Sequence, residues 1–152
     1  MKESLQEASD ELKRVDHQIY VSLKYTRTVD VLMNTIGRMI DAYNCLIDSL
    51  LKYAVEKNLR KEEYIPSTPL ERGNLVKQLF NDEIVQKNME LYFLLRKISK
   101  SVPKKEQEFR RHVTLRTVIG NKEVTLDIDK ATEYYNMIKE FYEWIEEKIN
   151  ES

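Results

Sequence analysis

Apolar residues recur every three or four positions along most of this chain, and that spacing predicts long amphipathic helices. The longest such run covers residues 28–58 and predicts a central helix around which the rest of the chain packs. Its apolar stripe consists of Val29, Leu32, Met33, Ile36, Met39, Ile40, Tyr43, Leu46, Ile47, Leu50 and Ala54.

A first helix is predicted over residues 4–25. Ser4 and Glu7 have capping-box spacing ahead of an apolar pattern of helical period. Two threonines just before the central helix offer N-caps, so we expect the chain to break there. The alternative is one bent helix that runs on to residue 58.

Two helices are expected in the middle of the chain. Thr68 followed by Pro69 is a strong helix start, and the short helix that follows should reach about Phe80. Asp82 is placed to cap the next helix, which should run to about Lys100.

The pattern then changes from helical to alternating. Residues 112–119 and 122–128 are rich in β-branched side chains, and Gly120-Asn121 between them suits a type II′ turn. The sequence therefore predicts a β-hairpin with one face on the helices. That face should consist of Val113, Leu115, Val124, Leu126 and Ile128.

Asp129 is placed to cap a last helix, whose apolar stripe continues to Ile149. The fold class that follows is a mainly α, single-domain helical bundle of about five helices with one β-hairpin, about residues 112–128, before the C-terminal helix. A chain of 152 residues with only 3 Gly and 3 Pro fits one such domain over residues 1–152.

Composition excludes several classes of site. The chain has 25 basic and 26 acidic residues, so its overall field gives no reason to expect nucleic acid. The single cysteine, Cys45, excludes an intrachain disulfide and a multi-cysteine zinc site, and the three scattered glycines form no phosphate-cradling loop. We predict no catalytic residue, no metal site and no cofactor. Since no apolar run approaches bilayer length, we expect a cytoplasmic protein without a membrane partner.

The local charge of residues 96–116 differs from that of the chain. This basic segment carries eight Lys and Arg against two Glu, in a chain whose net charge is -1. Such a cluster is a candidate site for RNA, DNA or a nucleotide phosphate. The alternative is that it stabilises a helix C-terminus and balances the acidic last helix. The candidate binding residues are Arg96, Lys97, Lys100, Lys104, Lys105, Arg110, Arg111, His112 and Arg116, with His112 in contact with phosphate.

The polar side of the central helix also has two interpretations. A line at helical spacing consists of Asn34, Arg38, Asp41, Cys45, Asp48 and Lys52. It predicts either a solvated face or a polar line along a cleft or a subunit contact.

The order of helices resembles the HEPN group of small prokaryotic helical domains. The stretches RMIDAYNCLIDSLLKYAVEKN and NMELYFLLRKISK carry the resemblance, which covers about residues 29–149. It implies a helical, commonly dimeric protein, in many members a ribonuclease that uses an Arg and a His separated by four to six residues. That motif is absent here, because Arg96 lies too far before His112 and Arg110 lies too close.

We therefore expect a domain that binds RNA or a nucleotide phosphate without catalysis. Whether the protein is an enzyme stays open, but the sequence favours a protein that is not one. The alternative is a homodimeric interaction or scaffold subunit without a nucleic-acid role; a HEPN-type ribonuclease ranks third. The expected partners are a second copy of the chain, and RNA or a nucleotide. Dimerisation would use aromatic residues beyond the needs of one core: Tyr134, Tyr135, Tyr142 and Trp144.

Overall fold

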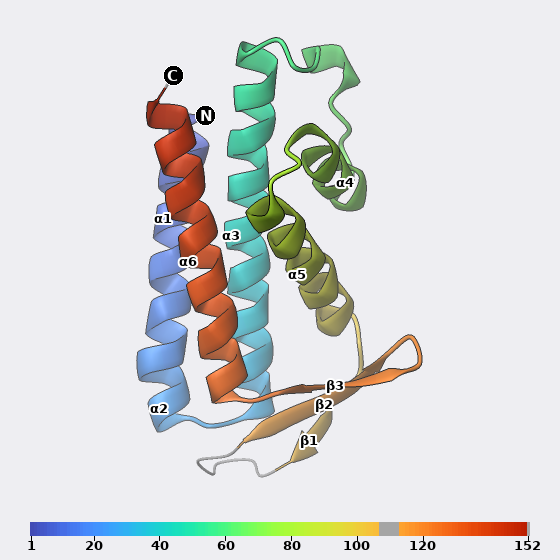
Figure 1. Ribbon diagram of the computed structural model, residues 1–152. Helices are drawn as coiled ribbons and strands as arrows, with labels where there is room; N and C mark the ends of the chain where they lie inside the picture. Colours follow the sequence, from blue (N-terminus) through green and yellow to red (C-terminus); the bar gives the residue numbers. More distant parts are fainter. Residues whose placement is uncertain (107–112, 152) are drawn as a thin grey trace.

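A computed structural model describes residues 1–106 and 113–151, where five long helical segments form a bundle with a small sheet at one end (Figure 1). The helices and strands are α1 (Lys2–His17), α2 (Leu23–Tyr25), α3 (Val29–Glu56), α4 (Pro69–Leu79), α5 (Glu83–Ser99), β1 (Lys104–Glu106), β2 (Thr114–Ile119), β3 (Lys122–Leu126) and α6 (Ile128–Asn150). The mainly α bundle with a hairpin before its last helix is confirmed.

Helix α1 continues without a break through one π-helical turn, Gln18–Ser22, into α2. The chain leaves helical geometry at Thr26, which confirms the expected break before α3 and excludes one bent helix. Thr28 caps α3 by accepting a hydrogen bond from the backbone N–H of Val31 at 3.2 Å. At the far end Asn58 adopts a left-handed φ of 60°, which turns the chain out of the helix.

Two predicted caps are wrong. Helix α1 begins at Lys2, so Ser4 lies inside the helix, where its side chain is buried against α3 instead of capping. Helix α6 begins at Ile128, and its cap is Asp127, which accepts from the backbone N–H of Lys130 at 2.8 Å. The alternating pattern extends to residue 128 and led us to place the cap at Asp129, two positions late.

The sheet has three antiparallel strands in the order β1-β2-β3. Strands β2 and β3 form the predicted hairpin, in which Ile119 pairs with Lys122. Gly120 has a φ of 64°, whereas Asn121 is not among the residues of positive φ, as a type II′ turn requires. The third strand, β1, lies between the predicted helix end at about Lys100 and the predicted hairpin, where the sequence predicted no strand.

The buried face of the hairpin is the predicted one. Val113, Leu115 and Leu126 are almost fully buried, and Val124 and Ile128 pack partly against the same core. Apolar residues from every long helix and from the sheet join one cluster. In Figure 1, α1, α3 and α6 run side by side, while α5 packs obliquely beside α3 and α4 lies next to α5.

Candidate functional site

The first three basic residues of the basic segment, Arg96, Lys97 and Lys100, lie at the C-terminal end of α5. Arg96 is half-buried, and its guanidinium lies over the ring of Tyr92, 5.6 Å from the centroid. Lys97 and Lys100 are exposed, and neither forms an ion pair with a residue that the structure describes. Of these three cations, the two lysines are therefore the ones open to a ligand.

The sheet brings the two halves of the basic segment together. Lys104 is the register partner of Arg116, and Lys105 is the partner of Leu115, across β1 and β2. Arg116 forms an ion pair with Glu123 of β3 at 2.9 Å. The predicted residues Arg110, Arg111 and His112 lie outside the described part of the chain.

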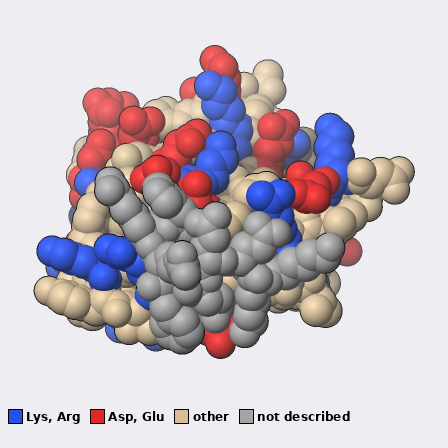
Figure 2. Space-filling view, turned by 90° about the horizontal axis from the view of Figure 1, so that it is seen from below, with Lys and Arg blue, Asp and Glu red and all other residues tan. Residues whose placement is uncertain are grey.

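Figure 2 views the molecule from the sheet end. Blue and red side chains alternate on this face around the residues that are not described, so the described surface is mixed in charge. No ion pair joins Arg96, Lys97 or Lys100 to an acidic residue of α6 within the described residues. The alternative in which the basic segment neutralises the acidic residues of the last helix therefore has no support from direct ion pairs of these three cations.

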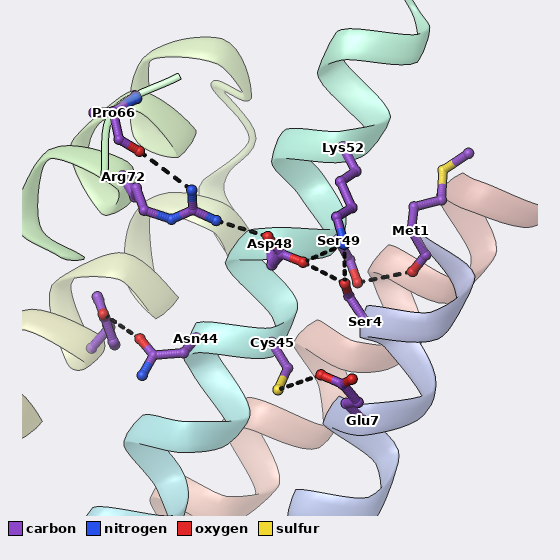
Figure 3. Close-up of polar contacts among 11 residues, drawn as sticks. Met1, Ser4, Glu7, Asn44, Cys45, Asp48, Ser49, Lys52, Pro66 and Arg72 are labelled. Atoms are coloured by element: carbon purple, nitrogen blue, oxygen red, sulfur yellow. Dashed lines mark hydrogen bonds and ion pairs between the residues drawn. The ribbon is translucent and has the colours of Figure 1, made fainter. Parts of the chain in front are cut away.

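A second polar cluster lies at the opposite half of the bundle, around Asp48 (Figure 3). The carboxylate accepts a short hydrogen bond from the hydroxyl of Ser4 on α1 and lies 2.9 Å from the Nζ of Lys52. It also lies 2.9 Å from the guanidinium of Arg72, whose other terminal nitrogen donates to the carbonyl of Pro66. One carboxylate therefore ties α3 to α1, to α4 and to the segment that leads into α4.

These contacts determine the ionisation of Asp48. Burial alone would raise the pKa of its carboxyl, but hydrogen bonds from Ser4 and Lys52 and the charges of Lys52 and Arg72 hold the pKa below its ordinary value. The hydrogen bond to Asp48 in turn raises the pKa of Lys52. Because its oxygens already have partners, ionised Asp48 is poorly placed to act as a general base.

Two shallow hollows flank the Asp48–Arg72 pair. One, of about 290 Å³, lies between α3 and the segment before α4, with Ile65 on its wall. The other, of about 320 Å³, is lined by Asn44, Cys45 and the ring of Tyr92 in addition to the ion pair. The Tyr92 hydroxyl donates to Asn44 at 2.6 Å and fixes this wall. The C-terminal half of the α3 polar line, from Cys45 to Lys52, therefore borders these two hollows, whereas Asn34, Arg38 and Asp41 are exposed.

Cys45 in this cleft is poorly suited to nucleophilic chemistry. Burial, together with the negative charges of Glu7, Glu11, Asp41 and Asp48, raises the pKa of its thiol to about 11. At neutral pH the group is thus almost entirely the protonated thiol, which is a weak nucleophile. Its sulfur lies 4.0 Å from a carboxylate oxygen of Glu7.

Sequence reasoning noted Asp48 and Lys52 but did not predict this cluster. Nothing in the sequence around Arg72 indicated that it pairs with Asp48, since a charged residue on a short helix is ordinarily exposed to solvent. Ser4 did have a signal, because it lies one helical turn before buried Ala8 and therefore on the buried stripe of α1. The capping pattern with Glu7 concealed that signal.

The described residues contain no group of three or more His, Cys, Asp or Glu side chains placed to hold a metal ion. Nor does any described helix combine the length and the apolar character needed to cross a bilayer. Two of the aromatic residues expected at a dimer surface, Tyr134 and Tyr135, are buried within the monomer instead. They are part of the chain's own core and lend no support to a subunit contact.

No protein-family model, curated protein or solved structure matches this chain. The resemblance to HEPN domains therefore stays a hypothesis, and the function has to be argued from the residues and their geometry.

Proposed function

We propose that the protein is a non-catalytic domain that binds single-stranded RNA by its phosphate backbone, at the surface formed by the end of α5 and the sheet. The observation that carries the proposal is that two exposed lysines at the C-terminal end of α5, Lys97 and Lys100, have no acidic partner in the described chain and lie just before β1. Lysines of this kind neutralise phosphates and release counterions.

The sheet extends this surface along the chain. The register of β1 and β2 pairs the backbone of Lys104 with that of Arg116, so the end of α5, β1 and the hairpin follow one another at one end of the molecule. On the outer face of β2 the neighbours of Arg116 are Thr114 and Val118, neither of which offers a ring for base stacking. We therefore expect affinity with little dependence on base sequence.

Salt dependence tests the proposal. If the surface neutralises about four phosphates of a single strand, the logarithm of the association constant should fall by about 3 for each tenfold rise in salt. The measurement is a titration of labelled single-stranded and structured RNA at two or more salt concentrations, with each mixture also checked for cleavage.

A pair of double variants separates local contacts from net charge. Lys97→Glu/Lys100→Glu should weaken binding at least tenfold at low salt and lower the salt slope by about 1 to 2. Arg60→Glu/Lys61→Glu changes the net charge equally on exposed residues beyond the far end of α3, and should leave most of the affinity. Equal losses in the two variants, or no binding at any salt, would contradict an RNA site at this end of the molecule.

A second candidate is the interaction subunit, for which a specific surface exists. Tyr20, Val21 and Tyr25 are 52%, 40% and 77% exposed around the π-helical turn and α2. Clustered exposed apolar side chains favour protein contacts. A homodimer through this surface predicts a twofold mass in light scattering that Tyr20→Ser/Tyr25→Ser reduces to the monomer, whereas a monomeric wild type would exclude it.

A further inference from the structure

Three aromatic rings surround the ammonium group of Lys148. Its Nζ lies 5.1 Å from the ring centroid of Trp144, 5.7 Å from that of Tyr53 and 5.7 Å from that of Phe80. Tyr53 comes from α3, Phe80 follows the last residue of α4, and Trp144 lies one turn before Lys148 on α6. We call the three rings the aromatic box.

One ring of the box is buried and the other two are partly open to solvent. Phe80 is only 4% exposed, whereas Tyr53, Trp144 and Lys148 are each partly exposed. The rings of Tyr53 and Phe80 lie 6.2 Å apart at 46°, so they form two walls that are not parallel. Since Tyr53 and Trp144 are partly exposed, a cation from solvent can reach these two rings.

The multiple rings set this contact apart. The other lysines that lie over rings in the described residues, such as Lys139 over Tyr135 at 5.3 Å, each contact one ring. A cation gains from the face of each aromatic ring within about 6 Å, and aromatic cages recognise quaternary ammonium groups for this reason.

We propose that the aromatic box is a binding site for a methylated, quaternary ammonium group, in which Lys148 is an intramolecular competitor. A primary ammonium is compact and strongly hydrated, so it loses hydration when it enters an aromatic box. A quaternary ammonium has no N–H to hydrate, and its methyl groups pack against ring faces while its charge interacts with them. Lys57, whose Nζ is 5.9 Å from the Tyr53 centroid, adds a second positive charge and limits the affinity.

The ligand class includes free choline-like molecules and trimethylated lysine side chains, which share the same head group. The test begins with the simplest probe, tetramethylammonium chloride, titrated at constant ionic strength. Trp144 is the only tryptophan in the sequence, so the intrinsic tryptophan fluorescence reports directly from the box. Line broadening of the tetramethylammonium proton signal provides a second measurement that does not depend on tryptophan.

Lys148→Ser should bind the probe about tenfold more tightly than the wild type, because the competitor is removed and the rings remain. Lys139→Ser removes a lysine from a single ring elsewhere and should match the wild type. In the Lys148→Ser background, Tyr53→Leu should abolish the gain. Thermal melts establish that each variant is folded before it is titrated.

A comparison of a charged ligand with a neutral one tests whether the box recognises the positive charge. Choline and 3,3-dimethylbutan-1-ol have nearly the same shape, and only choline is charged; equal binding of both would overturn the proposal. Binding that is the same in Lys148→Ser and Lys139→Ser, or absent from both, would overturn it as well. Titrations with choline and with trimethyllysine then show which source of the head group fits better. None of these outcomes depends on RNA binding, so the two proposals fail independently.

Discussion

Replacing Asp48 with Asn should destabilise the fold by about 2–3 kcal/mol, because the carboxylate joins three separate parts of the chain. The Ser4 hydroxyl that donates to it is only 3% exposed, so that group has little access to water if its partner is lost. The guanidinium of Arg72 is 25% exposed and would lose its charged partner. Weakening each of these two contacts from a charged to a neutral hydrogen bond costs about 1 kcal/mol.

The third contact adds little to that figure. The side chain of Lys52 is 52% exposed, and ion pairs at such positions are largely screened by solvent and contribute a few tenths of a kcal/mol. For a chain of 152 residues, a loss of this size should lower the melting temperature by about 5–10 °C, as followed by helical circular dichroism. Asp41→Asn is the matched control, because Asp41 is an exposed residue of the same helix.

The pH dependence gives the sharper test. The folded pKa of the Asp48 carboxyl lies below its ordinary value, so its contribution to stability is fully present above about pH 5 and is lost as the pH falls through the folded pKa. Wild type and Asp48→Asn should therefore differ by a constant amount near neutral pH, and the difference should shrink as the pH falls through the folded pKa. Equal melting of Asp48→Asn and Asp41→Asn at pH 7, or a difference from wild type that does not shrink in acid, would refute this role of Asp48.

Three further predictions concern the helices and the thiol. Gly37→Ala should raise the free energy of unfolding by up to about 1 kcal/mol, since an added Cβ meets no atom within 4 Å. Gly73→Ala should lower it by a similar amount, because its Cβ would lie 2.7 Å from the Phe93 ring of α5. Urea unfolding of the two variants should therefore give shifts of opposite sign. Tyr43→Phe should cost about 1–3 kcal/mol by removing the donor to the buried Asn88 side chain, and an unchanged unfolding midpoint would contradict it. The rate of alkylation of Cys45 by iodoacetamide should keep rising with pH up to about 11, and a plateau near pH 8.5 would show that the thiol is not perturbed.

The sequence predicted those features that local chemistry decides. The apolar period placed all the long helices, the cap of α3 is one of the two threonines that the sequence offered, and Gly120 indicated the turn because a positive φ is needed there. The buried face of the hairpin followed from simple alternation. Each of these features depends on residues within a few positions of one another.

Features that depend on distant partners escaped prediction. Strand β1 consists of Lys104, Lys105 and Glu106, a composition without strand character, and it forms because β2 offers a free edge. The Asp48 cluster joins residues 44 and 24 positions apart, and the aromatic box joins Tyr53 to a helix near the end of the chain. For the basic segment, the pattern supplied the charges, but only the fold distinguishes Arg96, stacked on a ring, from the two exposed lysines beside it.

The packing of α6 against both α1 and α3 has a consequence for how the protein is made. Ile138, Phe141 and Ile145 of this helix are fully buried, and the helix packs against α1 and α3, which end at residues 17 and 56, well before α6 begins at residue 128. During synthesis, the apolar stripes of α1 and α3 therefore have no cover on that side until residues 128–150 emerge. A nascent chain paused before this point exposes an apolar surface of the kind that chaperones recognise, and the bundle can close only after α6 has emerged from the ribosome.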